Sequence, residues 1–511
     1  MNSAQAQRLP FLRLALLTAA ALAIHGYHLG VEDAEIYIPA ASKLIHPDLF
    51  PFGAEFFQQH EHLSLFAPIL AGTARLTHLS TDATIFFWYI VTLFATLVSC
   101  WALAAVCFSS SRARWAAVLA ATVALSMPAA YTGLLLMDPY LTARSFSTPL
   151  INFALAAFLA RRPVLSALLT AITAVIHPQM AAYLLLLLAF LWIMERFAPA
   201  MPQAPAAAAV AILPAGFDLA PAQGAYREAL YARDFYFFFA WTWYDWLGLI
   251  APLAILGWFW KVRPRGTTPA FARLCLGLIP YGALSVVIAA VLSSSHVFDM
   301  LMRLQPLRTF HLVTMVFLLI FGGVVGEYAA RTSRWIFPAL CIGVATLMFF
   351  VERATYPASP HIEWPWVQNS SNAWINTLLW VRHNTPHDAV FAVDSRYFND
   401  PGVDKHGFRA IARRSELADY FKDGGAVAIF PALADEWKRQ TDATYGLNQF
   451  TAADFTRLAH EFPVTWAVIH GPAPAGMNCP YERQGYAVCE IPDAPGLAGG
   501  TQPAQQAAPT P

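Results

Sequence analysis

Residues 83–108 read ATIFFWYIVTLFATLVSCWALAAVCF, a run of 26 residues without a charged side chain. A helix needs about 20 apolar residues to cross the hydrocarbon core of a bilayer. A helix that is apolar on every face cannot lie on the surface of a soluble protein. This stretch therefore predicts a transmembrane helix, and it sets the class of the whole chain.

The remainder of the chain has a matching composition. Of its 511 residues, 57% are hydrophobic and only 13% are charged, which is far from the average of soluble proteins. Lys plus Arg (32) equals Asp plus Glu (32), so no basic excess points to nucleic acid. We expect an α-helical polytopic membrane protein with about eleven transmembrane helices and a small C-terminal α/β domain, and no nucleic-acid partner.

Ten further apolar runs are long enough to cross, or nearly cross, the hydrocarbon core of a bilayer. They are 11–29, 115–136, 146–160, 163–176, 180–194, 206–217, 246–260, 274–292, 310–325 and 335–350. A run of 14 residues spans only about 21 Å as a helix, so the short ones need shelter from their neighbours. The run 63–76 is interpreted as partly inserted, because a full crossing there would invert every later loop.

Alternate ends of these runs carry positive charge: Arg8, Arg13, Arg112, Arg114, Arg161, Arg162, Arg196, Lys261, Arg263, Arg265, Arg331 and Arg334. Such ends are typically cytoplasmic. The pattern predicts a multi-pass protein of the inner membrane, with a cytoplasmic N-terminus. Residues 1–354 would form the transmembrane domain, with outward loops 30–82 and 137–145. The first run also has the features of a cleavable signal peptide, and either way Glu32 emerges outside.

Hydropathy falls after Glu352, and helical and extended patterns then alternate. Helices are expected at 373–383, 432–439 and 455–461, and strands at 389–394, 465–470 and 486–491. Residues 355–493 should therefore form a soluble extracytoplasmic domain with a parallel or mixed sheet, followed by a disordered tail at 494–511. Cys479 and Cys489 could close a disulfide or remain two thiols.

The first outward loop carries the candidate catalysts. Glu32 and Asp33 directly follow the first span, where one of them could act as a general base or a metal ligand beside lipid-borne substrates. The alternative is a solvated helix cap. His60 and His62, two residues apart, could bind substrate or a metal, although interfacial histidines without such a role are common.

Three later segments carry candidate phosphate-binding groups. Arg144 follows Asp138 in the second outward loop, and a guanidinium binds phosphate well. His177 lies between two short spans. Arg303 and Arg308 enter a later span and together suggest a basic pocket. For each residue a local structural role, such as an ion pair or contact with lipid headgroups, is the alternative.

These features together resemble the GT-C superfamily of polytopic membrane glycosyltransferases, which use sugars carried on polyprenyl phosphates. The similarity rests on the Glu32-Asp33 pair, the sequence HEHL at 60–63, the short central spans, the closing α/β domain and the segment WVRHNTPHDA at 380–389. It implies transfer of a sugar from a polyprenyl-phosphate donor in the membrane lipid to an extracytoplasmic glycan, lipid or protein acceptor.

The resemblance also implies roles for the candidate residues. Asp33 or Glu32 would deprotonate the acceptor, and Arg144, Arg303 or Arg308 would bind the leaving phosphate. Some members of the superfamily use a divalent cation, so Mg²⁺ or Mn²⁺ held by Asp138 and the loop acids is a further expectation.

Two other classes of function fit the same sequence. A transporter or flippase for a lipid or sugar would not depend on the carboxylates of the first loop. A non-catalytic scaffold subunit of the same fold would depend on the C-terminal domain instead.

Overall fold

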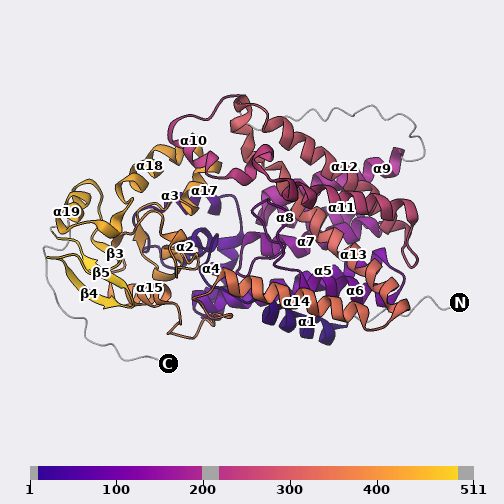
Figure 1. Cartoon of the computed structure of the whole chain (residues 1–511), viewed down its shortest axis with the longest axis horizontal. Helices are drawn as coiled ribbons and strands as arrows, with labels where there is room; N and C mark the ends of the chain where they lie inside the picture. Colours follow the sequence, from indigo (N-terminus) through magenta and orange to yellow (C-terminus); the bar gives the residue numbers. More distant parts are fainter. Residues whose placement is uncertain (1–9, 198–217, 493–511) are drawn as a thin grey trace.

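The computed structural model describes residues 10–197 and 218–492 of the chain. Figure 1 shows an elongated molecule with a bundle of helices in one half and a small sheet, formed by the C-terminal part of the chain, at the opposite end. Helices α2, α3 and α17 lie between the two. The protein is thus mostly helical, as its hydropathy predicts.

Six helical segments among the described residues are long and apolar enough to cross a membrane. They comprise α5 (Thr81–Cys107), α9 (Pro178–Phe197), α11 (Trp243–Val262), α12 (Pro269–Leu292), α13 (Phe310–Thr332) with the 3₁₀ turns η4 (His296–Leu304) and η5 (Pro306–Thr309) before it, and α14 (Ile336–Thr355). At about 1.5 Å per residue, the 27 residues of α5 extend about 40 Å. These six segments support the predicted class of membrane protein.

The expected number of about eleven such helices is not found. Four of the predicted runs form shorter helices, namely α1 (Phe11–His25), α6 (Ser111–Val123), α7 (Ala143–Leu159) and α8 (Pro163–Ile176). Their 13 to 17 residues extend only about 20–26 Å. The predicted run 206–217 and the predicted tail 494–511 lie outside the described residues.

Helix α6 is the clearest departure from the sequence prediction, which extended it to residue 136. It ends at Val123, and residues 124–136 turn back on themselves through a bridge between Pro128 and Leu135. Proline has no N–H to donate and disfavours a helical conformation in the residue before it. Gly133 supplies the positive φ of 70° that the turn requires. Apolar composition alone could not distinguish this turn from a longer helix.

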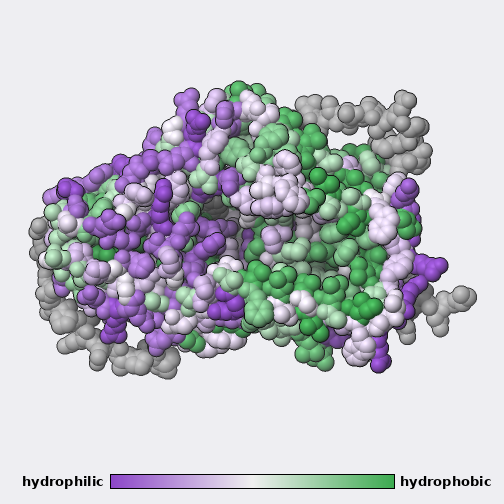
Figure 2. Space-filling model, in the orientation of Figure 1, coloured by the Kyte–Doolittle hydropathy of each residue, from purple (hydrophilic) through white to green (hydrophobic). Residues whose placement is uncertain are grey.

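The cationic ends of the helices gather at the end of the bundle that is remote from the sheet. Glu195 binds both Arg161 and Arg273 at 2.6 Å, and Glu327 pairs with Arg331 at 3.4 Å and accepts from Ser110 Oγ at 2.7 Å. Figure 2 shows a hydrophobic surface over the bundle, with a hydrophilic rim at this end and a hydrophilic surface over the sheet half. An apolar band between two polar ends is the surface expected of a membrane protein.

Short helices precede and follow the bundle helices on the sheet side. These are α2 (Ala34–Ile45), α3 (Glu55–Glu61), α4 (Phe66–Thr77) and α10 (Gly224–Tyr231), with the 3₁₀ turns η2 (Asp234–Tyr236) and η3 (Phe238–Ala240) after α10. Helix α4 occupies the run that the sequence suggests is partly inserted.

The C-terminal part forms one mixed sheet in the order β2-β1-β3-β5-β4. Its strands are β1 (Val390–Ala392), β2 (Ser415–Glu416), β3 (Trp466–His470), β4 (Asn478–Arg483) and β5 (Tyr486–Glu490). Strand β1 pairs in parallel with β2 and β3, whereas β5 pairs antiparallel with β3 and β4. Cys479 and Cys489 form a disulfide between β4 and β5.

Helices accompany the sheet at α15 (Ala373–Asn384), α16 (Phe408–Ala412), α17 (Lys422–Ile429), α18 (Ala434–Ala443) and α19 (Ala452–Glu461). The predicted helices and strands of this part are all present. The sequence did not predict the two-residue β2, the polar β4, or the short α16 and α17.

A buried ion cluster joins the two halves. Glu35 of α2 accepts hydrogen bonds from the backbone N–H and the Nε of Arg409, each at 2.9 Å, and from the N–H of Ala410 at 2.8 Å. A Cβ on Gly407 would lie 1.9 Å from the Glu35 carboxylate, so only glycine permits this approach. The contact fixes α2 against α16.

Three more carboxylates surround the same guanidinium. Arg409 lies 3.1 Å from Glu416, 3.5 Å from Asp419 and 2.5 Å from Asp423, and all of these side chains are at most 1% exposed. Burial, and then the charge of Glu35, raise the pKa of Glu416 well above its usual range despite the opposing charge of Arg409. One guanidinium cannot balance four buried carboxylates, so a proton is retained in the cluster.

We therefore expect Glu416→Gln to stabilise the protein at high pH. Because the folded-state pKa of Glu416 is raised, its stabilising protonation is complete below the unfolded pKa of about 4.3 and is lost as pH rises through the folded pKa. The amide cannot ionise, so thermal melts in detergent should show a Tm above wild type by about 3 °C at pH 8 and little difference at pH 5. The exposed Glu461→Gln is the matched control, and equal destabilisation by Glu416→Gln at both pH values would contradict the expectation.

Candidate functional site

A cleft of about 350 Å³ opens between the helical bundle and the sheet half. Its walls come from the start of α2, the start of α7, the α8–α9 junction, η2, η5 and α17. The polar residues lining it are Glu32, Asp33, Tyr37, Arg144, His177, Gln179, Arg233, Tyr236, Arg308, Asn399, Lys405 and Lys422. Segments that are up to about 400 residues apart in the sequence therefore meet at one place.

The lining is strongly cationic. Five arginine and lysine side chains face two carboxylates among the described residues that line the cleft. Partial exclusion of water strengthens the field of these charges. An anionic ligand is therefore the natural occupant.

Glu32 is held by two lysines. It forms an ion pair with Lys405 Nζ at 2.9 Å and a second one with Lys422 Nζ. Burial is the largest influence on its pKa and raises it, but the charges of Lys422 and Lys405 together outweigh burial and lower the pKa. Its backbone has a φ of 51°, an uncommon conformation for a residue other than glycine. Glu32 is thus an ionised group fixed in place at the edge of the cleft.

Asp33 is the more accessible carboxylate. It stands at the N-cap position of α2, but its side chain makes no capping hydrogen bond. Instead it accepts from Lys422 Nζ at 3.1 Å, and the side chain is 42% exposed. Burial raises its pKa, but Lys422, Arg144 and Arg308 outweigh that effect and hold the pKa well below the usual range. Asp33 therefore faces the cleft as a carboxylate and not as a helix cap.

Two arginines that each have a buried donor without a partner in the described part of the chain line the same cleft. The buried Nε atoms of Arg144 and Arg308 have no hydrogen-bond partner among the described residues. Arg144 is only 7% exposed and uses Nη2 to bind Asp138 at 2.5 Å. The Cζ atom of Arg308 lies 5.8 Å from the ring centroids of Phe235 and Tyr236. The two Nε atoms are closed off from solvent, but both guanidinium groups border the cleft and are suited to attract the oxygens of an anion.

Several of the sequence candidates lie elsewhere. Arg303 does not line the cleft, and it donates to the carbonyls of Met300 and Ile429. His62 is exposed after α3, away from the lining. The backbone of His60 lies in α3, while its side chain lies outside what the structure describes. The basic pocket expected from Arg303 and Arg308 thus receives only Arg308.

His177 and Asp138 both lie at or next to the cleft, but only His177 lines it. His177 lines the cleft between α8 and α9, and its Nδ1 is 3.5 Å from the N–H of Met180. Asp138 lies behind the lining as the partner of Arg144 and of Thr142. In the part of the chain that the structure describes, the only group of three possible metal ligands is His28, Glu363 and His406, which lies outside this cleft.

Sequence reasoning missed Lys405, Lys422 and Arg233. Lys405 and Lys422 lie in the C-terminal half, and no local motif marks either as a partner of Glu32. One weak signal is the pair Gly424-Gly425 after Lys422, because a Cβ at Gly424 would lie 3.1 Å from Arg233 Nη2. The glycines let α17 pack closely on Arg233 at the cleft wall.

No protein-family model matches the chain, and no curated protein matches it significantly.

We expect Arg308→Gln to weaken binding of a phosphate ester. A charge-assisted hydrogen bond is worth about 1.5–3 kcal/mol, so the Kd for geranyl phosphate should rise by about tenfold or more. Isothermal titration calorimetry in detergent would measure it. Arg303→Gln is the matched control because it removes the same charge outside the cleft, and an equal loss in both variants would argue against a site at Arg308.

Proposed function

We propose that the protein is a membrane glycosyltransferase that moves a sugar from a polyprenyl-phosphate donor to an extracytoplasmic acceptor. One observation carries the proposal. The ionised Asp33 and the guanidinium groups of Arg144 and Arg308 line one cleft, at the sheet end of a bundle that contains six long apolar helices. Such a cleft can hold a lipid-linked anion and an acceptor hydroxyl together.

The position of the cleft suits an amphipathic donor. The phosphate would bind Arg144 and Arg308, and the prenyl chain would extend along the apolar helices. The sugar would then lie toward the sheet half, near Asp33 and Asn399. Phe235 and Tyr236 in the cleft wall offer apolar faces beside the phosphate position.

The reaction would be one displacement with inversion. The acceptor oxygen attacks the anomeric carbon while its proton passes to Asp33. The bond between the anomeric carbon and the phosphate oxygen breaks, and its electron pair leaves with the polyprenyl phosphate. The added negative charge develops beside Arg144 and Arg308, where preorganised donors stabilise it.

The two first-loop carboxylates would have different roles. Glu32 is engaged by two lysines and would position the loop, whereas Asp33 is open to the cleft. The low pKa of Asp33 makes it a weak base in the empty cleft. A bound donor phosphate would offset the charges of Arg144 and Arg308 and raise that pKa, so base strength would increase when substrate is present.

The topology proposal follows from the cationic end of the bundle. If that end is cytoplasmic, the cleft and the sheet half face the extracytoplasmic side. The shorter α1, α6, α7 and α8 would cross beside the six long helices, which gives ten crossings among the described residues, and the expected eleventh, 206–217, lies outside them. Helix α9 ends at the cationic end, where Glu195 binds Arg161, and α10 begins on the cleft side, where Tyr226 contacts Ala428 of α17.

The test of the proposal is turnover of polyprenyl-phosphate sugars by purified protein in lipid. Asp33→Asn should lower kcat by about 10²–10⁴-fold while donor binding persists, because it removes the base without removing the cleft. Glu32→Gln should have a smaller effect, and the exposed Asp48→Asn is the control.

The outcomes separate the competing functions. Unchanged turnover in both first-loop variants would reject these catalysts. Absence of turnover with every donor, together with donor movement across the bilayer, would favour the transporter. Absence of both would favour the scaffold, in which residues 355–493 are required and Asp33 is not.

The pH dependence gives a further prediction. Catalysis needs ionised Asp33, so kcat/KM falls as pH drops through its pKa. Because that pKa is lowered, wild-type kcat/KM should stay flat from pH 8 to pH 5. Lys422→Met removes the largest charge that lowers the pKa, so its acid limb should lie at higher pH. An identical profile in the two proteins would exclude Asp33 as the titrating base.

A further inference from the structure

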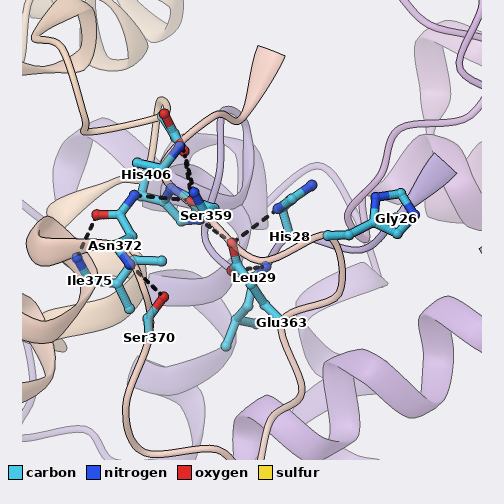
Figure 3. A network of polar contacts seen from close by, with 12 residues as sticks. Gly26, His28, Leu29, Ser359, Glu363, Ser370, Asn372, Ile375 and His406 are labelled. Atoms are coloured by element: carbon cyan, nitrogen blue, oxygen red, sulfur yellow. Dashed lines mark hydrogen bonds and ion pairs between the residues drawn. The ribbon is translucent and has the colours of Figure 1, made fainter. Parts of the chain in front are cut away.

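A second polar cluster lies beside the cleft, where three distant segments meet. His28 follows α1, Glu363 follows α14, and His406 precedes α16 (Figure 3). Glu363 Oε1 is 3.0 Å from His28 Nδ1 and 2.8 Å from His406 Nε2. The three side chains are at most 10% exposed, and their donor atoms all lie within 4.8 Å of one another.

The outer nitrogens of both histidines face groups that only accept hydrogen bonds. His28 Nε2 lies 2.6 Å from Glu352 Oε1, and His406 Nδ1 lies 3.0 Å from the carbonyl of Val403. Each outer nitrogen therefore carries the proton of a neutral imidazole. The inner nitrogens then direct lone pairs at the Glu363 carboxylate. That arrangement is repulsive unless a cation lies between them or both rings take a second proton.

The surrounding groups orient these donors in the way that metal ligands are usually oriented. Glu352 holds His28, as in a carboxylate–histidine–metal arrangement, and the Val403 carbonyl holds His406. Glu363 accepts the N–H of Leu29 on Oε2 at 2.8 Å, which leaves Oε1 toward the histidines. All three donors thus have a second contact that fixes their direction.

We propose that His28, Glu363 and His406 bind a first-row divalent transition metal, with Zn²⁺ as the ion of choice. Two imidazoles and one carboxylate form a common zinc donor set, whereas Mg²⁺ prefers oxygen ligands alone. A tetrahedral ion places its donors about 3.4 Å apart, so Glu363 Oε1 would move by about half an ångström from each imidazole nitrogen, while the two nitrogens, which lie within 4.8 Å of each other, would take the same spacing.

An access route is present. Glu363 also lines a cleft of about 420 Å³ together with Leu29, Ile362 and Trp364. The opening reaches Glu363 but neither of the two histidine ligands, so an ion would enter beside the carboxylate.

The ion would fix the loop that carries the first-loop acids. The N–H of Glu32 donates to the carbonyl of Lys405 at 3.0 Å, and the N–H of Gly407 donates to Gly30 at 2.8 Å. His406 stands within this paired backbone opposite Val31, His28 precedes the pairing, and Glu32 and Asp33 directly follow Val31. The metal would thus be a structural clamp beside the cleft, and the inference does not depend on the glycosyltransferase proposal.

Metal content tests the proposal directly. Protein purified through a tag without histidine, incubated with Zn²⁺ and then desalted, should contain about one Zn²⁺ per chain by mass spectrometry. Glu363→Gln and His406→Gln should retain less than about a tenth of that. The exposed His470→Gln should retain it all. Equal zinc in wild type and both ligand variants would overturn the proposal.

A measurement on the wild type guards against variants that fail to fold. Co²⁺ in place of Zn²⁺ should give the visible absorption bands of a tetrahedral ion. Chelation should lower Tm by about 5 °C, and added Zn²⁺ should restore it. A wild type that binds no zinc and melts at the same temperature with chelator or Zn²⁺ would overturn the site, and would leave a cluster of protonated histidines held by hydrogen bonds.

Discussion

The Arg409 guanidinium is the contact on which the geometry of the cleft depends. Glu35, two residues after Asp33, binds it from α2, and Asp423, one residue after Lys422, binds it from α17. The acid wall and the basic wall of the cleft are therefore set by the same buried ion. Asp33 lies 3.1 Å from Lys422 because the neighbouring residues Glu35 and Asp423 hold both segments to Arg409.

Burying the charges of this cluster opposes folding, and that cost indicates why the cluster is present. Desolvating charges costs several kcal/mol per ion, and a buried ion cluster is often no more stable than an apolar core. Excess carboxylates around Arg409 add to the cost. A chain that needed only to join its two halves could do so with apolar contacts. The cluster is better explained as a device that fixes position, which a site with an ionised Asp33 between cations requires.

Sequence patterns predicted the positions of those helices and strands that depend on local composition. The run 163–176 coincides with α8, and the helices and strands of the C-terminal part fall close to their expected places. Asp33, Arg144, His177 and Arg308, which were chosen for their chemistry, line one cleft. Lys405 and Lys422 could not be chosen that way, because their role comes from contacts with residues almost 400 positions earlier. Arg303 shares its local pattern with Arg308, yet only the fold determines which of them lies at the cleft.

The arrangement of fixed charges also bears on the choice between an enzyme and a transporter. Alternating access requires the two ends of a bundle to open in turn around a central site. Here the cationic end is tied by Glu195 to Arg161 and Arg273, and the cleft walls are tied through Arg409 at the other end. The contacts of Arg409 are buried and resist the separation of the groups they join, whereas Arg161 is 66% exposed and its ion pair adds little. A cleft with both walls held to one guanidinium suits a reaction that needs constant geometry more than a cycle that must open it.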